Sequence, residues 1–498
     1  MNDEIIKLIL NNYLNDINET NSSTAISLFK FNADLKDSNS ETNLHIQLNV
    51  KLVSLIQSRL SLERKLGLKL CSIWLNEQVS SLDCVRQFGK QWLEKSLSII
   101  NRGNDDSIIM ELSMKLINEI FSSSQRLPEF SRSVTQPLSV KYAQKLIDLS
   151  NNRSDLLIQS FNSINHHLVN HPSSFRPHLT SLNSLIINSI ANSPNHSSKS
   201  YLTSLSNLYF NSCKASGKVN ASQSFKSLIE SSLISIEYDL NVIFNECYPI
   251  SYNVNDKGLN LHSITSISND ILVDSPFIIK RIETLFYIIS KSLSNYNDTF
   301  ISIPIGKIVK MCTKVLHLTP TIIVSFLYFK FIIYLFFFFL QKENSNKLEI
   351  SSRISSLVPI TSYVCGLLAQ LSSSVHQSFS PHLSQIINAV SFHLTSDSNL
   401  NDSIKSSLYN LMNHLVNSRT LFDIDNIHLL RVFKSALRSL SPLFPPKHSP
   451  ISNVSFNNKS TGKGKKRSRN QFESDEAFSI TYKLSLSGTK VIINALKC

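Results

Sequence analysis

The sequence predicts an all-α fold, an α-solenoid of stacked helical hairpins of the HEAT or armadillo type. Apolar residues recur every three or four positions through most of the 498 residues, as they do along the buried face of a helix. Gly is scarce, at 10 residues, whereas average usage of roughly 7% would give about 35. Short polar breaks separate helical segments of about 15–20 residues, and such lengths suit stacked hairpins.

Residues 59–92 contain two of these segments with apolar stripes. The first stripe consists of Leu62, Leu66, Leu70 and Ile73, and the second consists of Val85, Phe88 and Trp92. Neither helix can bury its stripe alone, so we expect the two to form an antiparallel hairpin within a larger stack.

The same period predicts helices along the rest of the chain. After a short helix at 3–18, residues 19–43 are rich in Ser and Asn and are expected to be mobile. Further helices are expected at 44–57, 61–77, 82–100, 106–122, 138–150, 153–170, 176–192, 199–213, 223–245, 277–296, 304–318, 352–372, 381–395, 402–418 and 426–440.

These elements divide the chain into regions. We expect a flexible lead-in at 1–43, a helical-repeat domain at 44–245, a loop at 246–275, a second helical-repeat region at 276–445, a basic disordered linker at 446–478, and the start of a truncated helical segment at 479–498.

A seven-residue echo supports an internal repeat. Residues 174–180, SFRPHLT, match residues 378–384, SFSPHLS, and a Pro opening the second helix of a hairpin is common in HEAT-like arrays. Ser380–Pro381, like Ser275–Pro276, reads as a helix N-cap followed by Pro at the first helical position. His178 and His382 are interpreted as first-turn residues that pack or cap.

One apolar run does not fit the pattern. Residues 321–340 carry a single charge, Lys330, and are long enough to span a membrane. A charge near the bilayer centre is costly, and the flanking segments resemble helices of water-soluble proteins. We hypothesise first that 321–342 is an insertion from a translated intron, second that it is a buried core helix, and third that it spans a membrane.

The chemistry-bearing motifs of enzymes are absent from the sequence. It contains no P-loop, GxGxxG, GxSxG or HExxH motif. His166, His167 and His171 form a cluster, but zinc needs further ligands, so we interpret these as solvated or turn residues. The seven scattered Cys are interpreted as reduced thiols. We therefore expect no enzyme, no cofactor and no metal. Asp3 and Glu4 argue against a secretory signal.

The net charge of +13 suits an acidic partner without identifying one. Part of it is concentrated in one short run, formed by Lys463, Lys465, Lys466, Arg467 and Arg469. Such a run in a linker is read by nuclear import receptors or contacts RNA phosphates. We interpret it as a nuclear-localisation signal, with a solvated linker as the alternative.

Several stretches resemble a known family. Residues 62–78, LERKLGLKLCSIWLNEQ, 84–93, CVRQFGKQWL, 127–149, LPEFSRSVTQPLSVKYAQKLIDL, 175–190 and 301–316 are similar to segments of the proline-, glutamate- and leucine-rich nucleolar protein family, the Rix-type pre-rRNA-processing scaffolds. The chain departs from the family at the apolar run 321–340. It also ends at Cys498, before the further helices expected from the resemblance.

The resemblance implies a non-catalytic scaffold in a complex that matures the large ribosomal subunit in the nucleus, nucleolus and nucleoplasm and processes the second internal transcribed spacer. It implies as partners a WD-repeat propeller subunit, a second helical-repeat subunit, the pre-ribosomal particle and the AAA ATPase midasin, without a membrane and with at most indirect RNA contact. The alternative is an importin-like nuclear transport adaptor.

Overall fold

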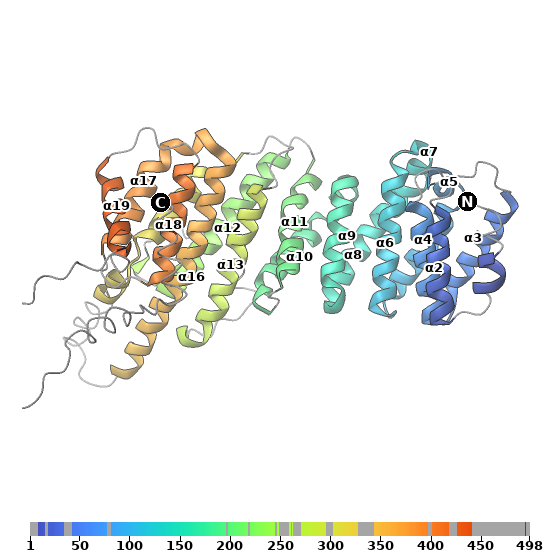
Figure 1. Ribbon diagram of the computed structural model, residues 1–498, viewed down its shortest axis with the longest axis horizontal. Coiled ribbons are helices and arrows are strands. Elements are labelled where there is room, and N and C mark those ends of the chain that lie inside the picture. The colour runs from blue at the N-terminus through green and yellow to red at the C-terminus, as the bar shows by residue number, and fades with distance from the viewer. Residues whose placement is uncertain are drawn as a thin grey trace, which may run out of the picture. The chain divides into compact units, whose positions relative to one another are not determined.

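All the secondary structure that the computed structural model describes is helical. The described residues are 8–14, 18–33, 42–76, 81–195, 198–217, 220–244, 247–248, 258–259, 261, 270–294, 302–326, 343–396, 401–417, 426–440 and 494. The all-α fold is thereby confirmed, and Figure 1 shows the helices.

The chain divides into two compact units that are interleaved in sequence. Unit 1 consists of Met1–Ser232, Lys257–Ser266 and Tyr287–Ile303, and unit 2 consists of Leu233–Asp256, Ile267–Phe286 and Pro304–Cys498. Two of the borders fall within long helices, one in α12 (Ala221–Phe244) and one in α13 (Ile271–Ser294).

Unit 1 is built from helical pairs in two rows. Its longer helices are α2 (Glu19–Ala33), α3 (Thr42–Gln57), α4 (Ser61–Asn76), α5 (Ser81–Arg102), α6 (Ser107–Ser124), α8 (Gln136–Asn152), α9 (Leu157–Asn170), α10 (Leu179–Ala191) and α11 (Lys199–Ala215). The first helices of the pairs, α3, α5, α8 and α10, contact one another in order. The second helices, α4, α6, α9 and α11, form the other row (Figure 1). This is the predicted stack of hairpins.

Short helical segments precede the longer helices of unit 1 or lie between them. They are η1 (Ile9–Tyr13), α7 (Pro128–Phe130), η2 (Ser131–Thr135), η3 (Ser154–Leu156), η4 (Pro172–His178) and η5 (Ser193–Asn195).

Unit 2 repeats the plan in its own helices. These are α14 (Ile305–His317), α16 (Glu343–Val375), η9 (His376–His382), α17 (Leu383–Ser396), α18 (Asp402–Asn417) and α19 (Asn426–Leu440). One row is α14, α17 and α19, and the other contains α16 and α18. By this alternation, α19 occupies the first-helix position of a third pair.

The predicted apolar stripes of α4 and α5 are buried against each other. Leu70 and Trp92 have no exposed surface, and Trp74 is 2% exposed. The rings of Trp74 and Trp92 lie 5.7 Å apart between centroids, and Trp92 Nε1 donates a 2.8 Å hydrogen bond to Asn49 Oδ1 of α3. The α3–α5 region is therefore closed by aromatic packing, with the buried indole N–H of Trp92 satisfied.

The seven-residue echo occupies equivalent positions in the two units. Its residues lie in the two 3-10 segments η4 and η9, which lead directly into α10 and α17. Phe175 and Phe379 are fully buried in their units. Pro177 and Pro381 lie inside the 3-10 segments, so the α-helix begins two residues later than the predicted Pro-first start. The 3-10 turn tolerates Pro at this point because its i→i+3 bonds leave few N–H groups in use.

Two further predictions are corrected by the structure. Residues 19–33, expected to be mobile, form α2, which packs on α4 with Ala25 fully buried. Helix α13 begins at Ile271, so Pro276 lies inside it and Ser275 is not its N-cap. Asp270 caps instead, since its Oδ1 accepts a 2.9 Å hydrogen bond from the Leu272 N–H.

The apolar run is described only to Phe326, and residues 327–342 lie outside the described part of the chain. The three interpretations of this run stay hypotheses. By length and composition, Leu348–Val375 of α16 could cross a membrane, but half of its apolar window is buried in the protein. Helix α14 and Pro320–Phe326 pass the same test only as a pair bent by 74°. Because α16 packs on α14 and α18, it serves as a core helix of unit 2.

Candidate functional site

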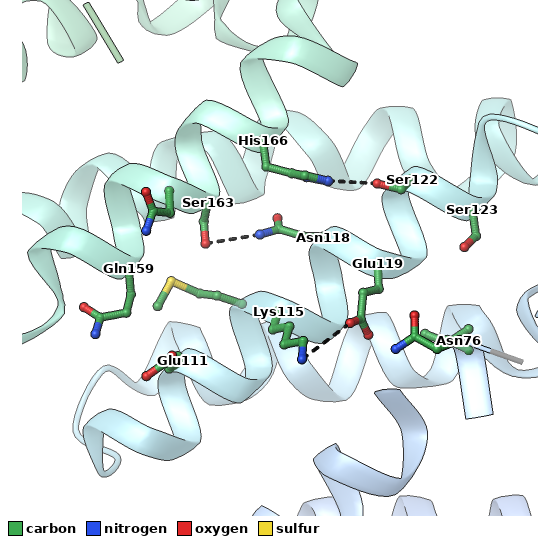
Figure 2. A pocket seen from close by; sticks show the side chains of 13 residues that line it. Asn76, Glu111, Lys115, Asn118, Glu119, Ser122, Ser123, Gln159, Ser163 and His166 are labelled. Carbon is green, nitrogen blue, oxygen red and sulfur yellow. Dashed lines mark hydrogen bonds and ion pairs between the residues drawn. The ribbon is translucent and has the colours of Figure 1, made fainter. Parts of the chain in front are cut away.

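A polar groove of about 490 Å³ crosses the second-helix row of unit 1, and we call it the row groove. Figure 2 shows its side chains, which come from α4, α6 and α9. The row groove is lined by Leu75, Asn76, Glu111, Met114, Lys115, Asn118, Glu119, Ser122, Ser123, Gln159, Asn162, Ser163 and His166. Polar positions dominate because the apolar sides of these helices face the other row.

Hydrogen bonds between small polar side chains join the helices beneath the groove. Asn118 Nδ2 donates to Ser163 Oγ at 3.2 Å, and Ser122 Oγ lies 2.9 Å from His166 Nε2 (Figure 2). Ser204 Oγ of α11 donates to Asn162 Oδ1 at 2.7 Å. These contacts set the spacing of neighbouring helices and leave the exposed Glu111 and Lys115 for a partner.

Glu119 is the carboxylate at the centre of the groove. Its burial raises its pKa, while the hydroxyl of Ser72 and the ammonium of Lys115 act in the opposite direction. Ser72 Oγ donates a short hydrogen bond to Oε2, and Lys115 Nζ lies 3.9 Å from Oε1 (Figure 2). The side chain of Glu119 thus anchors α6 to α4 and keeps a carboxylate at the groove wall.

Ser122 and His166 resemble two members of a nucleophilic triad. A Ser–His pair becomes a nucleophile only when a third group orients the imidazole. The Nδ1 atom of His166 is buried with no hydrogen-bond partner in the described structure. Burial lowers the pKa of His166, and neighbouring His171 lowers it further. The pair therefore joins α6 to α9 and lacks the orienting group that catalysis requires.

His171 lies in the turn after α9, as predicted for the His cluster, but His167 is neither solvated nor a turn residue. His167 is fully buried, its ring stacks on Phe121 at 5.1 Å, and its Nε2 lies 3.2 Å from the Ser139 carbonyl oxygen. Burial lowers the pKa of His167 to about 3. Among the described residues, no group of three or more His, Cys, Asp or Glu is placed to hold a metal ion. His167 is a neutral core residue that ties α9 to α8.

The other sequence-predicted residues lie apart from the groove. His178 stands at the N-cap of α10 without a side-chain capping bond, so of its two predicted roles only packing remains. His382 ends η9 in unit 2. The described cysteines are buried free thiols, as predicted: Cys71, Cys84, Cys213, Cys247, Cys312 and Cys365.

The basic run lies outside the described residues. It comprises Lys463, Lys465, Lys466, Arg467 and Arg469.

Sequence reasoning missed the row groove because its residues come from three separate helices. A usable signal exists in the spacing of the bonded polar pairs. The separations are 45 residues for Asn118 and Ser163, 44 for Ser122 and His166, and 42 for Asn162 and Ser204. These match one helical pair of a HEAT-type array, about 40–47 residues.

The family comparison covers the same part of the chain. Residues 6–197, which include α4, α6 and α9, match the family model RIX1, described as rRNA processing/ribosome biogenesis. Residues 6–197 are a RIX1-family region. The Rix-type resemblance stated from the sequence is thereby confirmed, and it supports a role in ribosome biogenesis. No curated protein matches the chain.

Solved structures add evidence on the fold. One similar structure is the Rix1 subcomplex of the Rix1–Rea1 pre-60S particle, with 15% identity, a TM-score of 0.60, and coverage of 87% of this chain and 77% of that one. Another is the karyopherin Kap121p bound to the extreme C-terminus of the phosphatase Cdc14p, with 13% identity, a TM-score of 0.44, and coverage of 87% and 41%. At 15% identity the first likeness shows a shared helical-repeat fold.

Proposed function

We propose that this protein is a non-catalytic scaffold subunit of a nuclear complex that matures the large ribosomal subunit and supports processing of the second internal transcribed spacer. The observation that carries the proposal is the RIX1-family match over residues 6–197. It falls on two rows of paired helices, and such arrays offer long lateral faces to partners.

The same proposal names the partners. A WD-repeat propeller subunit, a second helical-repeat subunit and the AAA ATPase midasin are expected to join this protein on the pre-ribosomal particle. The fold likeness to a chain of the Rix1 subcomplex of a pre-60S particle supports the pre-ribosomal particle, and the individual subunits follow from the family resemblance. The basic residues Lys463, Lys465, Lys466, Arg467 and Arg469 are proposed to direct the protein to the nucleus.

Affinity purification of the full-length protein tests the role. We expect the WD-repeat subunit and RNA containing the second spacer to co-purify, and we expect spacer-containing precursor to accumulate when the protein is depleted. Recovery of nucleoporins and transport cargo without a precursor defect would favour the importin-like adaptor instead.

The row groove is the proposed contact for one of these subunits. Glu111 is exposed at its edge and Gln159 is partly exposed on the neighbouring helix, so both can be changed without opening the core. A Glu111→Arg, Gln159→Arg double variant is expected to lose one subunit in the purification and to keep its helical content by circular dichroism. Arg86→Glu on α5, which lies outside the groove lining, is the matched control.

A further inference from the structure

Helix α19 of unit 2 carries large apolar side chains on its solvent-exposed surface. The exposed fractions are 65% for Ile427, 63% for Leu430, 62% for Phe433 and 52% for Leu437. The last three lie at positions i, i+3 and i+7 and therefore share one helix face. We call these four residues the α19 stripe. An exposed apolar group of this kind marks an interaction site more often than a scattered single residue does.

The α19 stripe is distinct from the face that α19 uses inside unit 2. Val432 is 2% exposed and Ala436 is 5% exposed, and the helix contacts α17 of its own row. The helix therefore has a buried face that fixes it to the unit and a second apolar face that stays exposed. Packing against the described residues of unit 2 does not explain the second face.

A positive edge runs along the α19 stripe. Arg431 and Lys434 each follow a stripe residue by one position, so they repeat the i, i+3 spacing on the adjoining side of the helix. Both are exposed. Helix α19 contains no Asp or Glu, so this edge has no compensating charge within the helix.

We propose that the α19 stripe binds an amphipathic helix of a partner protein whose apolar side chains are bordered by Asp or Glu. Apolar anchors at i, i+3 and i+7 are the pattern by which one helix docks on another. Burial of four large apolar side chains supplies the affinity. The acidic border pairs with Arg431 and Lys434 and fixes orientation and partner choice.

Charge argues against a second copy and against residues 479–498 of this chain as the occupant. The same face of a second copy would bring an identical positive edge, with no complementary charge. Residues 479–498 of this chain contain three Lys and no acidic residue. Moreover, Asn494 lies on α18, where its Nδ2 donates to the Ser406 main-chain and side-chain oxygens at 3.1 and 2.9 Å, while the α19 stripe stays exposed.

This inference is independent of the proposed role in ribosome biogenesis, because it concerns a different unit and rests on exposure and charge alone.

Two synthetic helical peptides of about 20 residues, or some 30 Å of helix, test it against the full-length chain. Both carry Leu at i, i+3 and i+7, bordered by Glu in one peptide and by Lys in the other. By fluorescence anisotropy, we expect the Kd of the Glu-bordered peptide to be lower than that of the Lys-bordered peptide by a factor of about ten or more. Preference for the Lys-bordered peptide, equal binding of both, or failure of the Glu-bordered peptide to bind overturns the proposal.

Variants locate the binding. The double variant Phe433→Asp, Leu437→Asp is expected to raise the Kd of the Glu-bordered peptide by a factor of about ten or more, because it removes central apolar anchors. Arg431→Glu and Lys434→Glu together are expected to reverse the preference toward the Lys-bordered peptide. Val273→Asp, at a 67% exposed apolar position on α13, is the control and should change nothing.

Two observations would reassign the α19 stripe. If the wild-type chain is a dimer in light scattering and Phe433→Asp makes it a monomer, the occupant is a second copy and the proposal is wrong. If the Phe433→Asp, Leu437→Asp variant binds the Glu-bordered peptide as the wild type does, the stripe is not the docking site. The substituted residues are exposed, so circular dichroism should show an unchanged fold.

Discussion

Two sets of polar contacts, one in each unit, join neighbouring helices by different chemistry. Under the row groove of unit 1, neutral Ser, Asn and His side chains bond from one helix to the next. In unit 2, Arg281 of α13 and Asp239 of α12 form an ion pair in which neither side chain has exposed surface. Arg281 Nε donates at 2.9 Å to Asp239 Oδ2 and Nη2 donates to Oδ1, a bidentate arrangement.

The difference teaches where each unit is vulnerable. A neutral hydrogen bond near a groove can be replaced by water when one partner is removed, at a cost of about 1 kcal/mol. A buried charge that loses its partner cannot be resolvated, so the cost is several-fold larger. The ion pair of unit 2 is therefore a structural weak point for substitution even though it need not add net stability over an apolar pair.

The largest effect is expected from breaking the ion pair. Asp239→Ala leaves Arg281 buried without its carboxylate, and should lower the free energy of unfolding by about 3–5 kcal/mol. Urea denaturation measures the change. Asp239→Leu combined with Arg281→Met removes both charges and should recover most of the loss. A single variant that loses under about 1 kcal/mol would show that the pair is not isolated from water.

Acid should weaken unit 1 through His167. Its pKa is about 3 in the folded chain, lowered by burial, with His166 and His171 lowering it further. The unfolded value is about 6.5, so the unfolded state takes up the proton first. The stabilising contribution is complete above pH 6.5 and is lost at about 1.4 kcal/mol per pH unit as pH falls toward 3.

Comparison of stability from pH 7 to pH 4 measures this effect. His167→Gln removes the titrating group and keeps a donor for the Ser139 carbonyl, so its stability should depend less steeply on pH than that of the wild type. His166 of the same helix and His171 at the C-cap of that helix still titrate in both proteins, as does any group on α6 and α8 that faces them. Equal slopes for the two proteins would exclude His167 as the source.

A smaller loss is expected in the helix-joining bonds of the row groove. Ser163→Ala removes the acceptor of the Asn118 amide, and should cost about 1 kcal/mol. A double-mutant cycle with Asn118→Ala measures the coupling between the two side chains. A coupling near zero would mean that packing alone sets the spacing between α6 and α9.

The smallest effect is expected at the exposed ion pair of α5. Arg86 lies 3.3 Å from Asp83, and the side chains are 67% and 71% exposed. Arg86→Ala should change the unfolding free energy by less than about 0.5 kcal/mol. Thermal unfolding of this variant and of Asp239→Ala then compares the stability lost when an exposed ion pair and a buried ion pair are broken. If Arg86→Ala lowered the free energy of unfolding by more than about 1 kcal/mol, Arg86 would belong to a charge network larger than its pair with Asp83.

Much of the helical framework could be predicted from the sequence, but its ends and polar contacts could not. The stripes of α4 and α5 were found because Leu70 and Trp92 lie on a local period of three to four residues. Helix α2 was missed because its Ser- and Asn-rich composition hides a single buried stripe at Ser22 and Ala25. The N-cap predicted at Ser275–Pro276 was wrong because Asp270 caps α13 about one turn earlier.

The sequence by itself determined that this chain folds into paired helices and that residues 6–197 carry a RIX1-family pattern, because helical period and local motifs are written in neighbouring residues. Only the tertiary structure decided that Asn118 meets Ser163 under a groove, that Arg281 is buried against Asp239, and that the α19 stripe is exposed. Each of these features depends on which helices pack together in space, and such helices can lie about 40 residues apart in the sequence. The residue pattern of a single helix does not indicate which helix packs against it.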